Sequence, residues 1–202
     1  QPPMRLRFPC FCLGIAALVT GCATWSGLRV TPAGQAADWR EFDRVVIGEF
    51  AAAVPPARST WQGDHAAVAE TAAAKLGGRV AAALRATGQF TVAHPDAPGG
   101  PPSLLVGGVV TKAIPGSAAA RDMGDEVAGR AEFAAAIEIR EAASARLLAA
   151  LRVDRRTWNV ERHDPVPETL EEFIGETARK LAAALVKARK TGHFPAAGPA
   201  VE

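Results

Sequence analysis

The first residue whose type and position suggest chemistry is Cys22, which ends the run Leu-Val-Thr-Gly-Cys. Small residues directly before a cysteine are typical of a cleavage box after an export signal. The preceding segment fits such a signal, because Arg5 and Arg7 come before a mostly apolar stretch at residues 8–19. That stretch is shorter than the roughly 20 apolar residues of a membrane-spanning helix. The spacing therefore predicts a signal peptide at residues 1–21, with a sulfur atom at the cleavage point.

This arrangement resembles the lipobox of bacterial lipoproteins. The resemblance implies that a diacylglycerol-derived group is joined to the Cys22 sulfur, that the chain is cut before Cys22, and that the new amine is acylated, typically with palmitate. Two or more acyl chains hold a protein stably on a membrane, since each buried methylene contributes about 0.8 kcal/mol. An aspartate after the cysteine retains such lipoproteins in the inner membrane, whereas Ala23 and Thr24 follow here and favour the periplasmic face of the outer membrane. The alternatives are an uncleaved anchor and a chance cysteine beside an ordinary signal.

Metal and thiol chemistry find little support in the mature chain. Cys10 and Cys12 leave with the signal, so no disulfide and no free thiol remain for catalysis or for a cysteine-based metal site. No two histidines share one face of an expected element; they are His65, His94, His163 and His193. We expect no metal and no other cofactor.

Nucleophilic and acid–base catalysis are also weakly indicated. The serines fall in expected loops or turns, and none lies in a Gly-x-Ser-x-Gly elbow. Gly107-Gly108 could cradle an anion, but no P-loop lysine or dinucleotide fingerprint accompanies it. An envelope hydrolase acting through carboxylates such as Glu49 or Asp125 is one alternative, and it requires two carboxyl groups to converge in a pocket. The sequence favours a protein without enzymatic activity.

A local basic cluster could contact lipid phosphates or an acidic partner. It is formed by Arg152, Arg155, Arg156 and Arg162. Acidic residues alternate with these arginines, which favours a solvated, salt-bridged strand edge; they are Asp154, Glu161 and Asp164. Trp61 and Trp158 would anchor a partner if exposed, and would belong to the core if buried.

The composition describes one domain of ordinary size. The chain has 202 residues, and removal of the two signal arginines leaves its basic residues equal in number to its 21 acidic ones. A chain of this length buries a full hydrophobic core, and a formally neutral one is disfavoured as a nucleic-acid-binding protein. We expect a lipidated tether at residues 22–40, a single α/β domain at residues 41–192 and a disordered tail at residues 193–202.

Helical periodicity predicts two long helices. Apolar residues at helical spacing cover residues 66–87, and Gly88 is placed as a C-terminal cap. Gly77-Gly78 inside this helix cost about 1 kcal/mol each relative to alanine, which predicts close packing on a sheet or a kink. Pro167-Glu168 open the second helix, which Gly192 ends.

Alternating and β-branched runs predict the strands, which cover residues 44–50, 89–92, 104–111, 133–139 and 147–153. The paired glycines at residues 107–108 suggest a bulge. The last two strands alternate apolar and polar residues around a turn at residues 141–145, so they form an antiparallel hairpin with Leu147 on its buried face. The expected fold is therefore α+β, with a mixed or antiparallel sheet of about five strands and two helices packed on it.

Several segments also carry a family resemblance. The strand at residues 42–47, the helix end at residues 84–90 and the strand at residues 104–111 occur in the order of a bacterial lipoprotein family known only as a domain of unknown function, the 4410-type periplasmic lipoproteins. The most specific match is the Arg-Asp-Met-Gly of residues 121–124 with the Gly-Arg-Ala that begins at Gly129. The chain departs from the family in the hairpin turn, where an aspartate and a threonine-glycine pair are usual. The resemblance implies no catalytic residues, and the architecture also resembles that of lipoproteins that assemble envelope machines.

These observations favour an outer-membrane-anchored periplasmic lipoprotein that acts as a non-enzymatic binding or envelope-assembly module. The expected partners are the membrane, through lipid on Cys22, and an unknown envelope protein or further copies of the chain, but no nucleic acid. Arg121, Gly124 and Gly129 mark the loop at residues 115–129 as the candidate contact loop. Besides the hydrolase, the other alternative is a ring-forming secretion or transport subunit that would use the hairpin at residues 133–154.

Overall fold

The computed structural model describes residues 27–53, 65–93, 102–117, 119, 129–156 and 169–195. Within these ranges the chain forms one six-stranded sheet with the strand order β1-β6-β5-β4-β2-β3. β2 runs parallel to β3 and β4, and the other neighbouring pairs are antiparallel. The predicted α+β class is confirmed, with a mixed sheet of six strands instead of about five. The strands are β1 (Gly27–Val30), β2 (Arg44–Ala52), β3 (Thr91–Ala93), β4 (Ser103–Ile114), β5 (Glu132–Glu141) and β6 (Leu147–Arg156).

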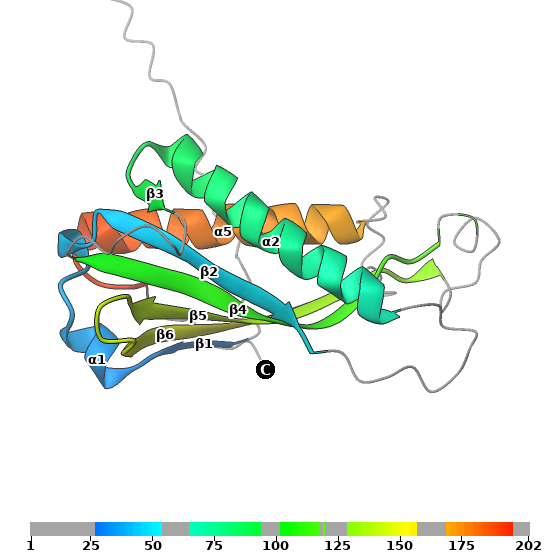
Figure 1. Cartoon of the computed structure of the whole chain (residues 1–202), viewed down its shortest axis with the longest axis horizontal. Helices are drawn as coiled ribbons and strands as arrows, with labels where there is room; N and C mark the ends of the chain where they lie inside the picture. Colours follow the sequence, from blue (N-terminus) through cyan, green and yellow to red (C-terminus); the bar gives the residue numbers. More distant parts are fainter. Residues whose placement is uncertain are drawn as a thin grey trace, which may run out of the picture.

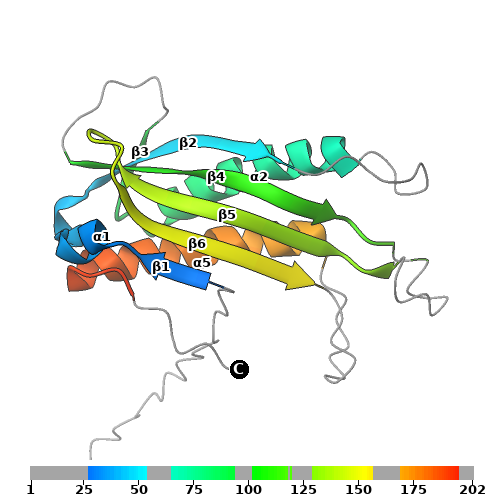
Figure 2. The ribbon, with the colours of Figure 1, turned by 90° about the horizontal axis from the view of Figure 1, so that it is seen from below.

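Two long helices lie side by side on one face of the sheet (Figure 1). α2 (His65–Thr87) packs on β2 and β4, and α5 (Leu170–Thr191) packs on α2 and β5. The helices run in the same direction, so their N-terminal ends lie together. A short helix α1 (Pro32–Ala36) and a 3-10 turn η1 (Trp39–Glu41) follow β1. Figure 2 shows the opposite face of the sheet, over which no long helix passes in the described ranges.

α2 faces the sheet with a stripe of buried residues at helical spacing, namely Ala69, Ala72, Ala73, Leu76, Val80, Ala81 and Leu84. Gly77 lies over β2, where an added Cβ would come within 3.2 Å of the Phe50 ring, while Gly78 faces open space. The predicted close packing is therefore confirmed at Gly77. Gly88 adopts a φ of 63° and donates its N–H to the Arg85 carbonyl at 3.0 Å, which confirms the predicted cap.

The bulge expected at the paired glycines is present, with its extra residue in the partner strand β2. β2 places two residues, Gly48 and Glu49, opposite Gly107 of β4. β4 carries its own extra residue further on, at Thr111. An added Cβ on Gly107 would lie 2.8 Å from the Glu49 carbonyl oxygen. Glycine is therefore needed here because the bulged backbone of β2 approaches β4 closely.

Residues 27–40, which we expected within a tether, belong to the folded unit. β1 pairs with β6 along its whole length. β6 has an extra residue at Leu148, whose carbonyl oxygen accepts the Thr31 N–H at 2.9 Å, while Gly34 packs so closely that an added Cβ would lie 2.1 Å from that oxygen. The extra residue also buries Leu148 in place of Leu147, which corrects the expected buried face. A strand of four residues is too short to show a clear alternation in the sequence.

α5 begins with a capping box and ends at a left-handed glycine. The Thr169 hydroxyl accepts the Glu172 N–H at 3.2 Å, and the Glu172 carboxylate accepts the Thr169 N–H at 2.6 Å. Gly192 adopts a φ of 82°, which confirms the predicted end. Phe194, expected in a disordered tail, is buried, and its ring centroid lies 4.8 Å from that of Trp39. This part of the expected tail therefore belongs to the core.

Candidate functional site

The sequence named one residue for lipid attachment and three for the candidate contact loop, and the structure describes one of these four. Cys22, Arg121 and Gly124 lie outside the described residues. Gly129 is buried at the base of the candidate contact loop, where its carbonyl oxygen lies 2.7 Å from an added Cβ on Gly116. Gly116 has a φ of 69°, a conformation that favours glycine. The two ends of the loop therefore cross closely, and the described role of Gly129 is structural.

Three charged side chains lie near this crossing. Glu132, at the start of β5, is 8% exposed and forms ion pairs with Lys112 of β4 and, at 3.8 Å, with Arg130. Burial of a carboxylate is costly unless hydrogen bonds and ion pairs compensate it. The three side chains therefore link β4 and β5 at the base of the loop.

The described histidines and carboxylates form no cluster of three that could hold a metal ion. Two histidines lie outside the described residues, while His65 begins α2 and His193 follows the opposite end of α5. Within the described ranges no three His, Cys, Asp or Glu side chains come together. Glu49 is exposed on β2 and lines neither of the grooves described below. Asp125, the other carboxylate named for the hydrolase alternative, lies outside the described residues.

The predicted basic cluster supplies a structural ion pair. Arg155 of β6 contacts Glu176 of α5 at 2.5 Å and lies over the Phe173 ring at 5.3 Å. Burial raises the pKa of Glu176, but the hydrogen bond from Lys180 and the nearby positive charges outweigh it and lower the pKa below its ordinary value. These contacts support the interpretation of Arg155 as part of a salt-bridged strand edge. Other residues named for partner contact lie outside the described side chains: Trp61, Arg156, Trp158 and Arg162.

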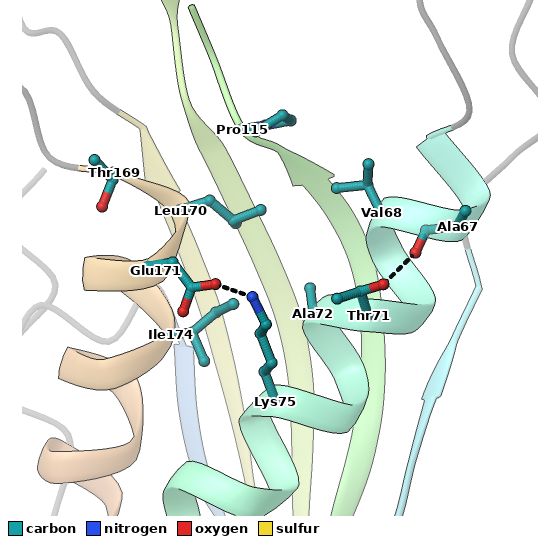
Figure 3. A pocket seen from close by; sticks show the side chains of 10 residues that line it. All are labelled: Ala67, Val68, Thr71, Ala72, Lys75, Pro115, Thr169, Leu170, Glu171 and Ile174. Carbon is teal, nitrogen blue, oxygen red and sulfur yellow. Dashed lines mark hydrogen bonds and ion pairs between the residues drawn. The ribbon is translucent and has the colours of Figure 1, made fainter. Parts of the chain in front are cut away.

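Two grooves lie along the seam between α2 and α5, one at each end. The N-terminal groove has a volume of about 410 Å³ and is lined mainly by apolar side chains, with Pro115 beside it. Figure 3 shows Lys75 of α2 and Glu171 of α5 forming an ion pair across the seam. This groove therefore carries one positive and one negative charge.

The C-terminal groove has a volume of about 630 Å³ and a different chemistry. Ala182 is buried and Val186 is half-buried, so the deeper part of the groove is apolar. Three exposed cations of α5 line it, namely Arg179, Lys187 and Lys190. No carboxylate is among its lining residues. This groove therefore carries positive charge only.

The sheet face opposite the long helices, which we call the uncovered face, has no long helix over it among the described residues (Figure 2). Leu105 and Val109 of β4 point to this face, because Leu104, Val106 and Val110 alternate with them and belong to the core cluster. Val46 of β2 lies opposite Leu105 in the strand register and also lies outside that cluster. Alanines continue the apolar surface across β5 and β6; they are Ala134, Ala136 and Ala150. Charges of both signs lie among them, including Arg140, which donates to the Glu138 carboxylate at 2.9 and 2.8 Å.

The expected hairpin lies inside the sheet. β5 pairs with β4 and β6, and β6 pairs with β5 and β1. β1 covers the outer edge of β6 at residues 149–152, and no described strand lies beside residues 153–156 on that edge.

Together these features define the class of the protein as an α+β domain with an open mixed sheet and two parallel helices on one face. No helix within the described ranges has the length and apolar character needed to cross a membrane. No known family model matches the chain, and no curated protein matches its sequence.

Among solved structures, the chain is similar to the PelC dodecamer protein of Paraburkholderia phytofirmans, with 16% identity over 79% of this chain and 95% of that chain and a TM-score of 0.49. A Xanthomonas campestris protein of the DUF330 family is 14% identical over 82% of this chain and 95% of that chain, with a TM-score of 0.46. A candidate lipoprotein of Caulobacter crescentus is 16% identical over 73% of this chain and 93% of that chain, with a TM-score of 0.38. At these identities and scores, the similarities assign no function.

Proposed function

We propose that this chain is a lipoprotein anchored through Cys22 in the outer membrane, whose periplasmic domain is a non-enzymatic assembly module that associates with its own copies. The observation that carries the assembly role is the uncovered apolar face of the sheet. The anchoring role is supported by the cysteine box at the end of an export-type segment.

The uncovered face departs from what a solvated sheet face requires. A face in contact with water normally carries polar side chains that alternate with the buried ones. Here Leu105 and Val109 are half-buried, so each keeps part of an apolar side chain at the surface, whereas Val46 is 7% exposed and contributes little. Apolar side chains at the surface with charged residues around them are typical of an interaction site.

A second copy of the chain is the partner that the charges of this face favour. An interface between identical copies must be self-complementary, so a patch of one sign would repel its own copy. The face carries both signs, with Glu138 and Asp154 among Arg140 and Arg152. Two copies can therefore bring apolar strands together while opposite charges meet beside them.

The anchoring is tested by the change Cys22→Ala in cells. The wild-type protein should carry acyl groups on its first residue by mass spectrometry and should sediment with outer membranes. The variant should lack the modification and leave the outer-membrane fraction, because no acyl chain remains to be buried. An unmodified wild-type protein in the soluble fraction would show that the lipobox assignment is wrong.

Self-association is tested by sedimentation velocity on the unlipidated chain from Ala23 to Glu202, which contains every described residue. Ala136→Lys adds a charge at an exposed position of the uncovered face and should weaken association about tenfold or more, because an unpaired charge would be buried. Ala82→Lys, at an exposed position of α2, is the matched control and should leave it unchanged. Melting temperatures check that both variants are folded.

A wild-type chain that stays monomeric at every concentration would overturn self-association, as would equal effects of the two lysines. The lipidation experiment is independent of this result, so the two parts of the proposed function fail separately.

A further inference from the structure

The C-terminal groove lies on the helical side of the molecule, away from the uncovered sheet face. Six of its residues belong to one stripe of α5, at spacings of three and four: Arg179, Ala182, Ala183, Val186, Lys187 and Lys190. Ala83 and Ala86 of α2 lie on the other side. Alanine side chains end at Cβ, so the two helices leave a trough between them. Residue spacing does not reveal this groove, because it exists only once the two helices face each other.

The charges of the groove are unbalanced. Within the described residues, neither Lys187 nor Lys190 has a carboxylate within ion-pair distance. Arg179 lies about two turns before Lys187 along α5, close enough to Glu176 to contribute to the lowered pKa of that carboxyl group. Three cations around one trough repel one another, and an anion placed between them removes that repulsion.

Capping of the helix dipole explains only part of this charge. Cations stabilise the negative C-terminal end of a helix, but the effect falls off within the last turn. Arg189 and Lys190 occupy that turn of α5, and Lys187 and Arg179 lie before it. Arg189 also stacks over Phe90 at 5.3 Å. The remaining cations line the groove without this structural task.

The N-terminal groove provides an internal contrast. It lies on the same seam and is also apolar, but its lysine, Lys75, is paired with Glu171. A site for a neutral apolar group needs no excess of charge. The C-terminal groove combines an apolar floor with unpaired cations, which is the chemistry of a site for a molecule with an apolar part and an anionic head.

We infer that the C-terminal groove binds an anionic amphiphile, with its acyl chain along the alanines and Val186 and its carboxylate or phosphate between Lys187 and Lys190. This inference goes beyond the proposed function, since it concerns a different surface and a small ligand. A free fatty acid and a phospholipid share the required chemistry and differ in the head group.

The test is isothermal titration of the unlipidated chain from Ala23 to Glu202, which carries no covalent acyl chain to compete. The probes are dodecanoate, monododecyl phosphate and the non-ionic dodecyl maltoside, each below its micelle-forming concentration. We expect at least one anionic probe to bind about tenfold more tightly than the non-ionic one, because charge-assisted hydrogen bonds add to the apolar contact. The preferred anionic probe identifies a carboxylate or a phosphate head.

Two variants separate the contribution of the ligand's head group from that of its acyl chain. The double change Lys187→Gln and Lys190→Gln should weaken anionic binding about tenfold and leave the non-ionic probe unchanged. Ala183→Phe, at an exposed position, should fill the trough and weaken all probes. Lys75→Gln in the N-terminal groove is the control and should leave binding unchanged.

Absence of binding by both anionic probes would overturn the inference, as would equal binding of the non-ionic probe or insensitivity to the two variants. Vesicles of phosphatidylglycerol supply the last arm. Binding to these vesicles without binding to either monomeric probe would show that the cations contact a membrane surface, and would overturn the groove as a single-molecule site.

Discussion

Trp39 shows how single residues join parts of the chain that are distant in sequence. It is 1% exposed, its indole N–H donates to the Gly34 carbonyl at 2.8 Å, and its backbone N–H donates to the Gly192 carbonyl at 3.2 Å. Its ring packs against Phe42 and Phe194. One side chain therefore attaches the segment after β1 to the end of α5.

The indole hydrogen bond gives a prediction at this scale. Trp39→Phe keeps an aromatic ring but leaves the Gly34 carbonyl without its donor, which should lower the free energy of unfolding by about 1–3 kcal/mol. Phe194→Leu is the control, because it changes packing alone and should cost less than about 1.5 kcal/mol. Urea unfolding measures both. A smaller loss for Trp39→Phe than for the control would contradict the assigned role of the hydrogen bond.

Among the elements, those with long and regular patterns were predicted well from the sequence. α2 and the β5–β6 hairpin have enough residues for their period to be clear, and the caps at Gly88 and Gly192 have an evident chemical reason. β1 was missed because its four residues show no period, and the buried face at Leu147 was wrong because one extra residue reverses the alternation. Bulges depend on partner strands, which a linear pattern does not contain.

The capping box of α5 predicts a pH dependence at this scale. The Thr169 N–H and hydroxyl bond to the Glu172 carboxylate, and they lower its pKa from the ordinary value of 4.5. A lowered folded-state pKa adds stability that is fully present above 4.5 and is lost as the pH falls through the folded value. Glu172→Gln should therefore destabilise the protein at neutral pH, and the difference from wild type should shrink in acid.

Unfolding in urea at a series of pH values measures this difference. The control is Glu70→Gln, because the exposed side chain of Glu70 on α2 has no hydrogen bond or ion pair within the described part of the chain. The difference in unfolding free energy between Glu70→Gln and the wild type should depend less on pH. A difference for Glu172→Gln that stays constant down to pH 3 would contradict the contribution assigned to the capping box.

For the whole molecule, the fold class follows from the sequence, whereas the candidate surfaces depend on how the elements come together. The alanines of α2 and α5 look like ordinary helix formers until the helices lie side by side (Figure 1). Likewise, Leu105 and Val109 look like core residues until the long helices of the described chain are seen to lie on the other face of the sheet (Figure 2). Tertiary geometry, which residue spacing does not specify, decides both sites.

The pairing of β1 with β6 has a mechanical consequence if Cys22 carries lipid. Only four residues separate Cys22 from Gly27, a link of roughly 17 Å at full extension. A pull on the lipid would reach β1 directly and act along the strand. The hydrogen bonds of an antiparallel pair lie across the strands, so they would bear this load together and not one after another. β1, a strand of four residues that the sequence pattern does not reveal, would then transmit force between the membrane and the sheet.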